Sequence, residues 1–133
     1  MLEYLPTDKL REHWPFIETG LKRILDRSPD RWIPPDVYSM AIQGHVGVYL
    51  YRNPSIDGFV VLQPIAAWDG KDCNVFAAYS TSGVDTEVLE ATKQEAVKMG
   101  CKRLVFHSKR MGWDKRAEQM GYKRGHTLWE MEL

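Results

Sequence analysis

A helix-length segment between two apolar strands constrains the fold of this chain more than any other feature. Residues 73–80 and 103–107 are short apolar runs typical of strands. Between them, residues 85–99 carry apolar side chains at helical spacing and end at Gly100. Two strands joined by a helix run parallel in one sheet, because the helix returns the chain to the end where it started. The sequence therefore predicts one right-handed crossover.

The segments before and after this unit complete a mixed fold. Apolar spacing predicts a helix over 7–26, which we expect Pro15 to divide into a turn at 8–13 and a main helix over 15–25. A second helix is expected over 35–42, and strands over 46–52 and 58–68, with a turn at Asp69-Gly70. A short helix at 115–120 and a last strand along 127–133 follow. The predicted class is α/β (α+β): a mixed, mostly antiparallel central sheet, helices on both faces and one parallel crossover pair.

Length and charge narrow the protein class but not the partner. The 133 residues are expected to form one domain over 1–133, and the formal net charge of zero says nothing about a nucleic-acid or membrane partner. No apolar run reaches the ~20 residues that span a bilayer, and the first residues do not resemble a secretion signal. Cys73 and Cys101 do not form a CxxC pair and are expected to be buried, reduced thiols. These observations favour a soluble, cytoplasmic protein.

Three segments resemble the GNAT acyltransferases. The helix ending at Ala117-Glu118-Gln119-Met120-Gly121-Tyr122 is similar to the family's helix that ends in Gly-Phe, and Asp57-Gly58-Phe59-Val60-Val61 is similar to one of its strands. The segment 32–44 resembles small phage-encoded GNAT-like proteins. The resemblance implies the GNAT fold, acetyl-coenzyme A as cofactor and transfer of an acyl group to an amine. A phage origin would place the protein in the host cytoplasm or the virion.

The resemblance places the coenzyme A diphosphate at the loop before the 85–99 helix. That loop offers Ser80, Thr81, Ser82, Gly83 and Val84 as cofactor-binding residues through their backbone donors. It has a single glycine, lacks the family's Arg or Gln, and is followed by two carboxylates in the first helical turn, Asp85 and Glu87. Carboxylates there stabilise a helix but repel a diphosphate. The alternative is an ordinary helix start capped by Ser82 or Asp85.

The resemblance also says where a catalytic acid belongs, and that position holds Ala117, which has no proton to give. His107, at the end of the 103–107 strand, is the candidate general base, and Tyr79 is the candidate acid. Alternatively, His107 is a hydrogen-bonded histidine at a strand end. Tyr122 stands where the family's phenylalanine packs and is interpreted as a core residue. The four histidines are scattered, so we predict no metal site.

Two further features keep other functions open. Eight basic residues and two acidic ones fall between Lys102 and Arg124, a composition suited to coenzyme A phosphates, an acidic protein or nucleic acid. Exposed members of Trp14, Trp32, Trp68 and Trp113 would mark a protein interface. The hypotheses are therefore an acyl-coenzyme A-dependent N-acyltransferase with a degenerate cofactor loop, or a non-catalytic binding or assembly module. The second would be a pseudoenzyme such as a phage virion or accessory protein, with a protein partner or a homo-oligomer. A nucleic-acid-binding domain ranks third.

Overall fold

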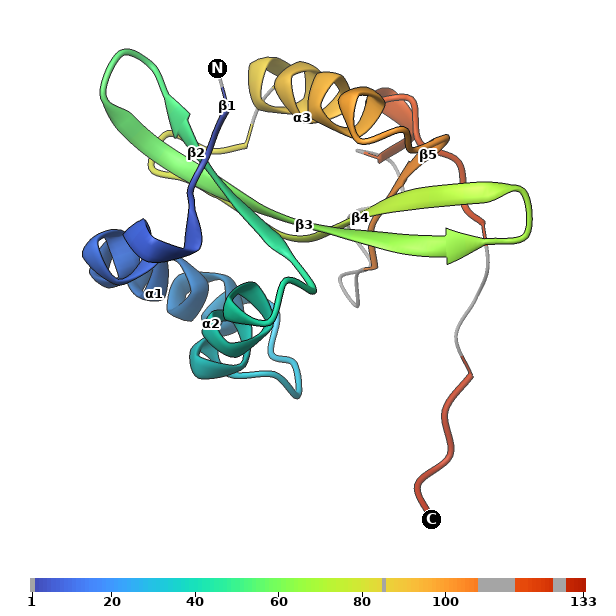
Figure 1. The fold of residues 1–133 in the computed structure, drawn as a ribbon. Helices are drawn as coiled ribbons and strands as arrows, with labels where there is room; N and C mark the ends of the chain where they lie inside the picture. The colour runs from blue at the N-terminus through green and yellow to red at the C-terminus, as the bar shows by residue number, and fades with distance from the viewer. Residues whose placement is uncertain (1, 85, 108–116, 126–128) are drawn as a thin grey trace.

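The computed structural model describes residues 2–84, 86–107, 117–125 and 129–133. Its helices and strands follow one another in the order shown in Figure 1. They are β1 (Leu2–Tyr4), α1 (Thr7–Arg27), α2 (Pro34–Ile42), β2 (Gly47–Arg52), β3 (Ile56–Ala67), β4 (Gly70–Ser80), α3 (Thr86–Lys98) and β5 (Arg103–Val105). Residues 117–119 are helical, in agreement with the short helix expected at 115–120, whose first two residues lie outside the described part.

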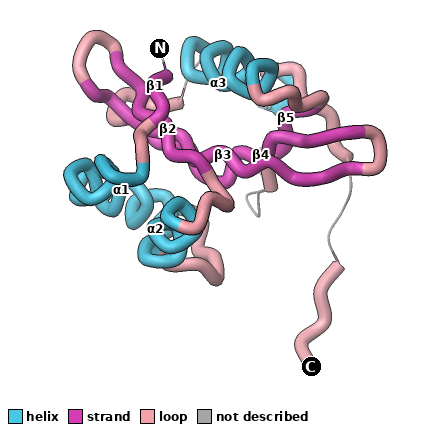
Figure 2. Tube along the Cα trace, in the orientation of Figure 1, coloured by secondary structure: helices cyan, strands magenta, loops and turns pink. Residues whose placement is uncertain are grey.

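A five-stranded sheet in the order β1-β2-β3-β4-β5 forms the centre of the molecule. The first three pairs are antiparallel, and β4 and β5 are parallel. Helix α3 makes the crossover between β4 and β5 and covers one face, while α1 and α2 cover the other (Figures 1 and 2). The predicted fold class and the parallel pair are confirmed, and the strand for which the sequence gives little signal, β1, is present.

The expected break at Pro15 is wrong, because α1 runs without interruption from Thr7 to Arg27. The missing N–H of Pro15 deprives only the Arg11 carbonyl of a partner, and both residues lie on the exposed side of the helix. Water can therefore serve that carbonyl. On the other side, Leu10, Ile17 and Leu21 are fully buried against the sheet, and this packing stabilises the helix.

The sheet separates two apolar cores. Side chains of β2 alternate between them: Val48 and Leu50 pack toward α1 and α2, while Tyr49 and Tyr51 pack toward α3. Strand β3 lies inside the sheet and its residues 58–62 are buried on both faces. On the face that α1 covers, the packing is tight at Gly20, where a Cβ atom would stand 2.5 Å from the Phe59 ring.

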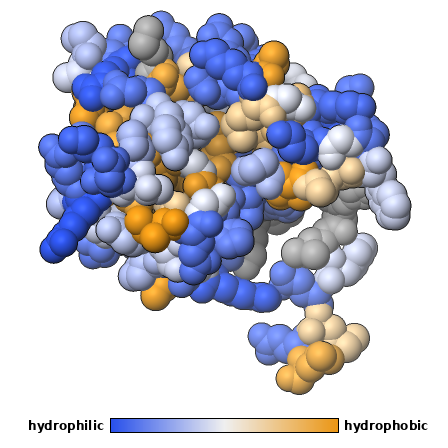
Figure 3. Space-filling view, viewed as in Figure 1, coloured by the Kyte–Doolittle hydropathy of each residue, from blue (hydrophilic) through white to orange (hydrophobic). Residues whose placement is uncertain are grey.

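The C-terminal third departs from the sequence expectations. The predicted strand 103–107 is shorter and less buried, since β5 ends at Val105 and Arg103 is exposed. Residues 129–133 of the predicted last strand are not in a strand, and Trp129, Met131 and Leu133 are exposed. Their alternating apolar pattern predicts burial, whereas these three side chains are exposed in the described structure. Figure 3 shows hydrophobic side chains on this projecting tail. Thr127 lies outside the described residues.

Candidate functional site

Strand β4 changes its neighbours halfway along its length. Val61 pairs with Ala77 and Leu62 pairs with Val75, so Phe76 is an extra residue that makes a β-bulge. On its other edge, β4 pairs with β5 only over Asp72, Cys73 and Asn74. Among the described residues, β4 from Val75 to Ser80 therefore has a strand partner on one edge only.

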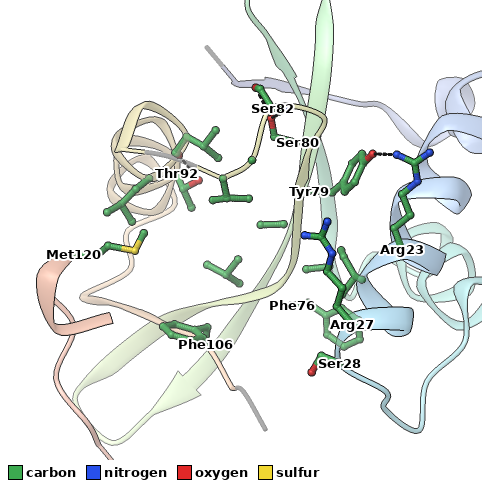
Figure 4. A pocket seen from close by; sticks show the side chains of 18 of the residues that line it. Arg23, Arg27, Ser28, Phe76, Tyr79, Ser80, Ser82, Thr92, Phe106 and Met120 are labelled. Atoms are coloured by element: carbon green, nitrogen blue, oxygen red, sulfur yellow. Dashed lines mark hydrogen bonds between the residues drawn. The ribbon is translucent and has the colours of Figure 1, made fainter. Parts of the chain in front are cut away.

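A cleft of about 570 Å³ opens along this free edge. Figure 4 shows it between α1, β4, α3 and the segment that follows β5. Its lining residues come from four parts of the chain. They are Arg23, Ile24, Arg27 and Ser28; Val75 to Val84; Val88, Leu89 and Thr92; and Phe106, His107, Met120 and Tyr122.

Aromatic packing and a hydrogen bond fix the wall that α1 forms. The Tyr79 ring lies 5.7 Å from the Phe59 ring and 6.2 Å from the Phe16 ring, measured between centroids. The Arg23 Nη1 donates a hydrogen bond of 2.9 Å to the Tyr79 hydroxyl (Figure 4). Because the Tyr79 oxygen accepts this bond, its own hydrogen remains available to another acceptor.

Asp57 organises the loop that leads from β4 to α3. Its carboxylate accepts hydrogen bonds from the hydroxyls of Ser80 at 2.8 Å, Ser82 at 2.9 Å and Thr81. The bond from Thr81, followed by those from Ser80 and Ser82, holds the pKa of Asp57 below its ordinary value. The loop N–H groups are also engaged: Thr81 donates to the Asp57 carbonyl and Gly83 to the Ser80 carbonyl. Two of the backbone donors expected for a diphosphate are thus used within the loop.

The predicted site residues meet in this cleft. Tyr79, His107 and the segment Ser80–Val84 all line it, and His107 is exposed. Of the two carboxylates expected to repel a diphosphate, Glu87 accepts a 3.1 Å hydrogen bond from the Tyr51 hydroxyl and is not a lining residue. Asp85 lies outside the described residues. Ala117 is absent from the lining.

The described members of the basic run at 102–124 do not line the cleft. Arg103 pairs with Asp69 and Asp72, and Lys102 packs over Gly70. Neither these residues nor Lys123 and Arg124 line the cleft. Lys109, Arg110, Lys115 and Arg116, together with Trp113 and Asp114, lie outside the described residues. The arginines of the cleft instead come from α1.

Sequence reasoning missed several lining residues. Arg23 and Arg27 are four residues apart on α1, and that spacing on one helix face was the available signal. Tyr122 was expected in the core, but it lines the cleft with its ring in edge-to-face contact with Phe106, at 4.8 Å between centroids. Burial raises the pKa of Tyr122, so its hydroxyl keeps its proton at neutral pH.

Other chemistries find less support in the described structure. Cys73 is buried as expected, and burial raises the pKa of its thiol to about 11, so it is a poor nucleophile. Cys101 is half-buried, and both cysteines are free. In the described part of the chain, no three His, Cys, Asp or Glu side chains lie where they could hold a metal ion. None of the described helices has the length and apolar character to cross a membrane.

Solved acetyltransferase structures share this arrangement over the whole chain. Neither a protein-family model nor a curated protein sequence matches the sequence of this chain. The ribosomal-protein-alanine N-acetyltransferase from Brucella melitensis biovar Abortus 2308 superposes with a TM-score of 0.71 at 14% identity, covering 100% of this chain and 99% of the other. The aminoglycoside acetyltransferase meta-AAC0020 from an uncultured soil metagenomic sample, in complex with sisomicin, gives 0.68 at 13% identity, covering 100% and 95%. A transcriptional regulator from Bacillus halodurans C-125 gives 0.68 at 16% identity, covering 100% and 99%. The fold is that of the GNAT acetyltransferases.

Proposed function

We propose that this protein is an acyl-coenzyme A-dependent N-acyltransferase that binds its acyl donor along the free edge of β4. The observation that carries this proposal is the separation of β4 from β5 after Asn74, which opens a cleft running from Phe106 to the loop before α3. A strand edge in a cleft offers backbone N–H and C=O groups to a ligand that contains amides. The pantetheine arm of coenzyme A is such a ligand.

The residues of the cleft suit this ligand over most of its length. Val75, Ala77 and Ala78 are small and apolar, so an extended chain has room beside the strand. Gly83 has a φ of +95° and no atom within 4 Å of where its Cβ would stand, so its backbone is open to close approach. Because the N–H groups of Thr81 and Gly83 are engaged within the loop, we assign the diphosphate to the first turn of α3, where Val88 and Leu89 line the cleft. The Glu87 carboxylate, which would repel it, is bonded to the Tyr51 hydroxyl and does not line the cleft.

The cleft also contains the groups that acyl transfer needs. A bound acyl-coenzyme A supplies a thioester carbonyl that a neutral amine can attack. The His107 imidazole can accept the proton that the amine loses, and the Tyr79 hydroxyl can give its proton to the departing sulfur. Arg23 orients the Tyr79 hydroxyl for that donation. Tyr122 is the second acid candidate, because it lines the same cleft and a tyrosine hydroxyl carries its proton at neutral pH.

Calorimetric titration with acetyl-coenzyme A tests the proposal. We expect a micromolar Kd for the wild type and thermal stabilisation of about 2.7 kcal/mol at a hundredfold excess over Kd. Ala78→Phe fills the edge of β4 and is expected to abolish binding. Ala66→Phe, on the exposed part of the β3–β4 hairpin, is the matched control and should bind normally. Absence of heat and of a thermal shift at millimolar acetyl-coenzyme A would refute coenzyme A chemistry.

Thiol release from acetyl-coenzyme A in the presence of an amine panel tests the roles of the side chains. His107→Ala should lower kcat by about 10²- to 10⁴-fold, the usual contribution of a general base. Comparing Tyr79→Phe with Tyr122→Phe identifies the acid, since only the variant that lacks it should show a similar loss. Normal turnover in both tyrosine variants would assign the proton donation to water.

A non-catalytic binding module is the second candidate, and the hairpin tip favours it. Trp68 is fully exposed between β3 and β4, with Ile65 exposed nearby, whereas Trp14 and Trp32 are half-buried against the core. A protein that did not bind acetyl-coenzyme A but lost a partner upon Trp68→Ala would fit this alternative. Trp113 lies outside the described residues.

A further inference from the structure

The described lining of the cleft is basic although the chain as a whole is neutral. It contains Arg23, Arg27 and His107 and no aspartate or glutamate. The chain has 18 Lys and Arg residues and 18 Asp and Glu residues, so this one-sided composition is local. A ligand that enters beside these residues meets positive charge without a carboxylate to balance it.

The two arginines stand on consecutive turns of α1 and face β4. Figure 4 shows the Arg27 side chain reaching from the end of α1 into the space beside Phe76 and Tyr79, with Arg23 held at the Tyr79 hydroxyl. Other arginines of the protein are committed to carboxylates: Arg31 to Glu130, Arg52 to Glu3, and Arg103 to Asp69 and Asp72. Arg23 and Arg27 form no ion pair with a described carboxylate, so their guanidinium groups can bind an anion.

The arginines and the start of α3 lie on opposite faces of the sheet. Helix α1 covers one face and α3 the other (Figure 1), and the loop Thr81–Val84 leads from β4 toward α3. The assignment of the diphosphate to α3 therefore leaves the α1 wall for the second substrate. A polycationic amine would be repelled by that wall, whereas an amine that carries a carboxylate would be attracted.

We infer that the acyl acceptor is an amine bearing an anionic group, such as an amino acid, whose carboxylate Arg27 binds with help from Arg23. This inference rests on the proposed acyltransferase function. The planar guanidinium of Arg27 matches a carboxylate in a two-pronged hydrogen bond. Binding the carboxylate there would place the neighbouring amine in the cleft that Tyr79 and His107 line.

Paired acceptors test the inference. Free amino acids are compared with their carboxamides, which keep the amine and lack the negative charge, by thiol release from acetyl-coenzyme A. We expect kcat/KM to be about tenfold higher for the acids, and the preference to shrink in 0.5 M NaCl because salt screens exposed charges. As a readout independent of turnover, N-acetylamino acids and their amides are titrated into the protein saturated with coenzyme A, with the same preference expected in Kd.

Variants assign the preference to the α1 wall. Arg27→Gln should remove most of the acid preference, Arg23→Gln part of it, and Arg27→Lys should restore some by returning the charge. Arg11→Gln is the matched control, since Arg11 is exposed on the same helix but does not line the cleft. None of these variants should change the Kd of acetyl-coenzyme A.

The possible outcomes separate a failure of this inference from a failure of the proposed function. Equal use of acids and amides in both readouts overturns the inference while leaving the acyltransferase function standing. A weaker Kd for acetyl-coenzyme A in Arg27→Gln also overturns it, because the arginines would then serve the cofactor. Failure of the wild type to bind acetyl-coenzyme A defeats the proposed function itself, and the inference falls with it.

Discussion

The two halves of β4 are stabilised by different forces. From Gly70 to Asn74, β4 has β3 on one edge, and Asp72, Cys73 and Asn74 also pair with β5 on the other edge. From Val75 to Ser80 it pairs with β3 alone, and its other edge faces the cleft. One strand thus supports the sheet in its first half and lines the cleft in its second.

The difference shows what replaces a missing strand. The first half is held by backbone pairing and by surface contacts such as Arg103 with Asp69 and Asp72. The second half depends on side chains: Tyr79 packs on Phe16 and Phe59, Phe76 packs on Trp32, and Asp57 binds the residues at its end. A sheet can therefore open a ligand edge where packing and hydrogen bonds from neighbouring elements compensate for lost pairing.

Removal of the aromatic support beneath the second half should have the largest effect. Phe59 is fully buried between α1 and Tyr79, and Phe59→Ala is expected to cost about 3–5 kcal/mol of unfolding free energy. Urea unfolding followed by circular dichroism measures this cost. Val97→Ala, at a side chain that is 73% exposed on α3, is the control and should change stability by less than about 0.5 kcal/mol. Similar losses in both variants would contradict the comparison.

The second-largest loss of stability is expected from crowding β3 against β4 where Gly58 pairs with Ser80, at the end of the cleft next to the loop before α3. A Cβ at Gly58 would stand 2.0 Å from the Tyr79 carbonyl oxygen and 2.8 Å from the Ser80 Cα, both of which are backbone atoms. Gly58→Ala should cost about 1–3 kcal/mol, because the two strands must separate to admit the methyl group. Gly125→Ala, where no atom lies within 4 Å, should be nearly neutral in the same urea titration. A neutral Gly58→Ala would show that the strands at this end are loosely paired.

Loss of the Asp57 carboxylate should have a smaller effect that depends on pH. The pKa of Asp57 is lower in the folded protein than its ordinary value of about 3.9, so its stabilisation is complete above that value. The stabilisation disappears as pH falls through the lower, folded pKa. The difference in unfolding free energy between wild type and Asp57→Asn should thus be largest at pH 7 and shrink toward pH 2. Urea titrations at both pH values measure it, and a constant difference would refute the role of the charge.

The smallest effect is expected in the first half, from the surface ion pairs. Arg103 and Asp69 are exposed and Asp72 is half-buried, and exposed ion pairs contribute little. Arg103→Gln should lower the melting temperature slightly in dilute buffer and not at all in 1 M NaCl. The bond to Arg103 lowers the pKa of Asp69 to about 2, so the wild type should lose this contribution as pH falls from 4 to 2, whereas Arg103→Gln, which lacks it, should lose less stability over that range. A large loss that salt does not reduce would show that the first half also depends on specific contacts.

The parts of the fold that obey a simple periodicity could be predicted from the sequence. The crossover through α3 was predicted from the helical spacing of Val88, Thr92 and Ala96, all of which are buried. Helix α2 ends at Ile42, and Gly44, with a φ of +81°, follows it in the left-handed conformation that commonly terminates a helix. Pro15 misled because its effect depends on whether water reaches the Arg11 carbonyl, which is a property of the tertiary structure.

The cleft itself could be located only in part. Tyr79, His107 and the loop residues were identified by resemblance to a family, and they line one cavity. The bulge that opens the cleft was not predicted, because residues 73–80 carry no glycine or proline to mark it. Nor could the sequence show that Asp57 engages the loop, since 23 residues separate Asp57 from Ser80. Contacts between distant segments are fixed by the sheet register.

The extra residue at Phe76 also shifts the phase of everything that follows it in β4. In an uninterrupted strand Phe76 and Ala77 would face opposite sides, yet both pack toward α1, and from there the order of sides is reversed. Tyr79 faces α1 and Ala78 faces α3 only because of that reversal. If β4 kept every residue but ran without the bulge, the two would exchange sides, turning the tyrosine away from Arg23 and bringing a methyl group in its place. Removing the extra residue itself would leave Ala77 opposite Val61 and both sides unchanged. The chemical character of each side of the cleft is thus set by the bulge as much as by the identity of the residues.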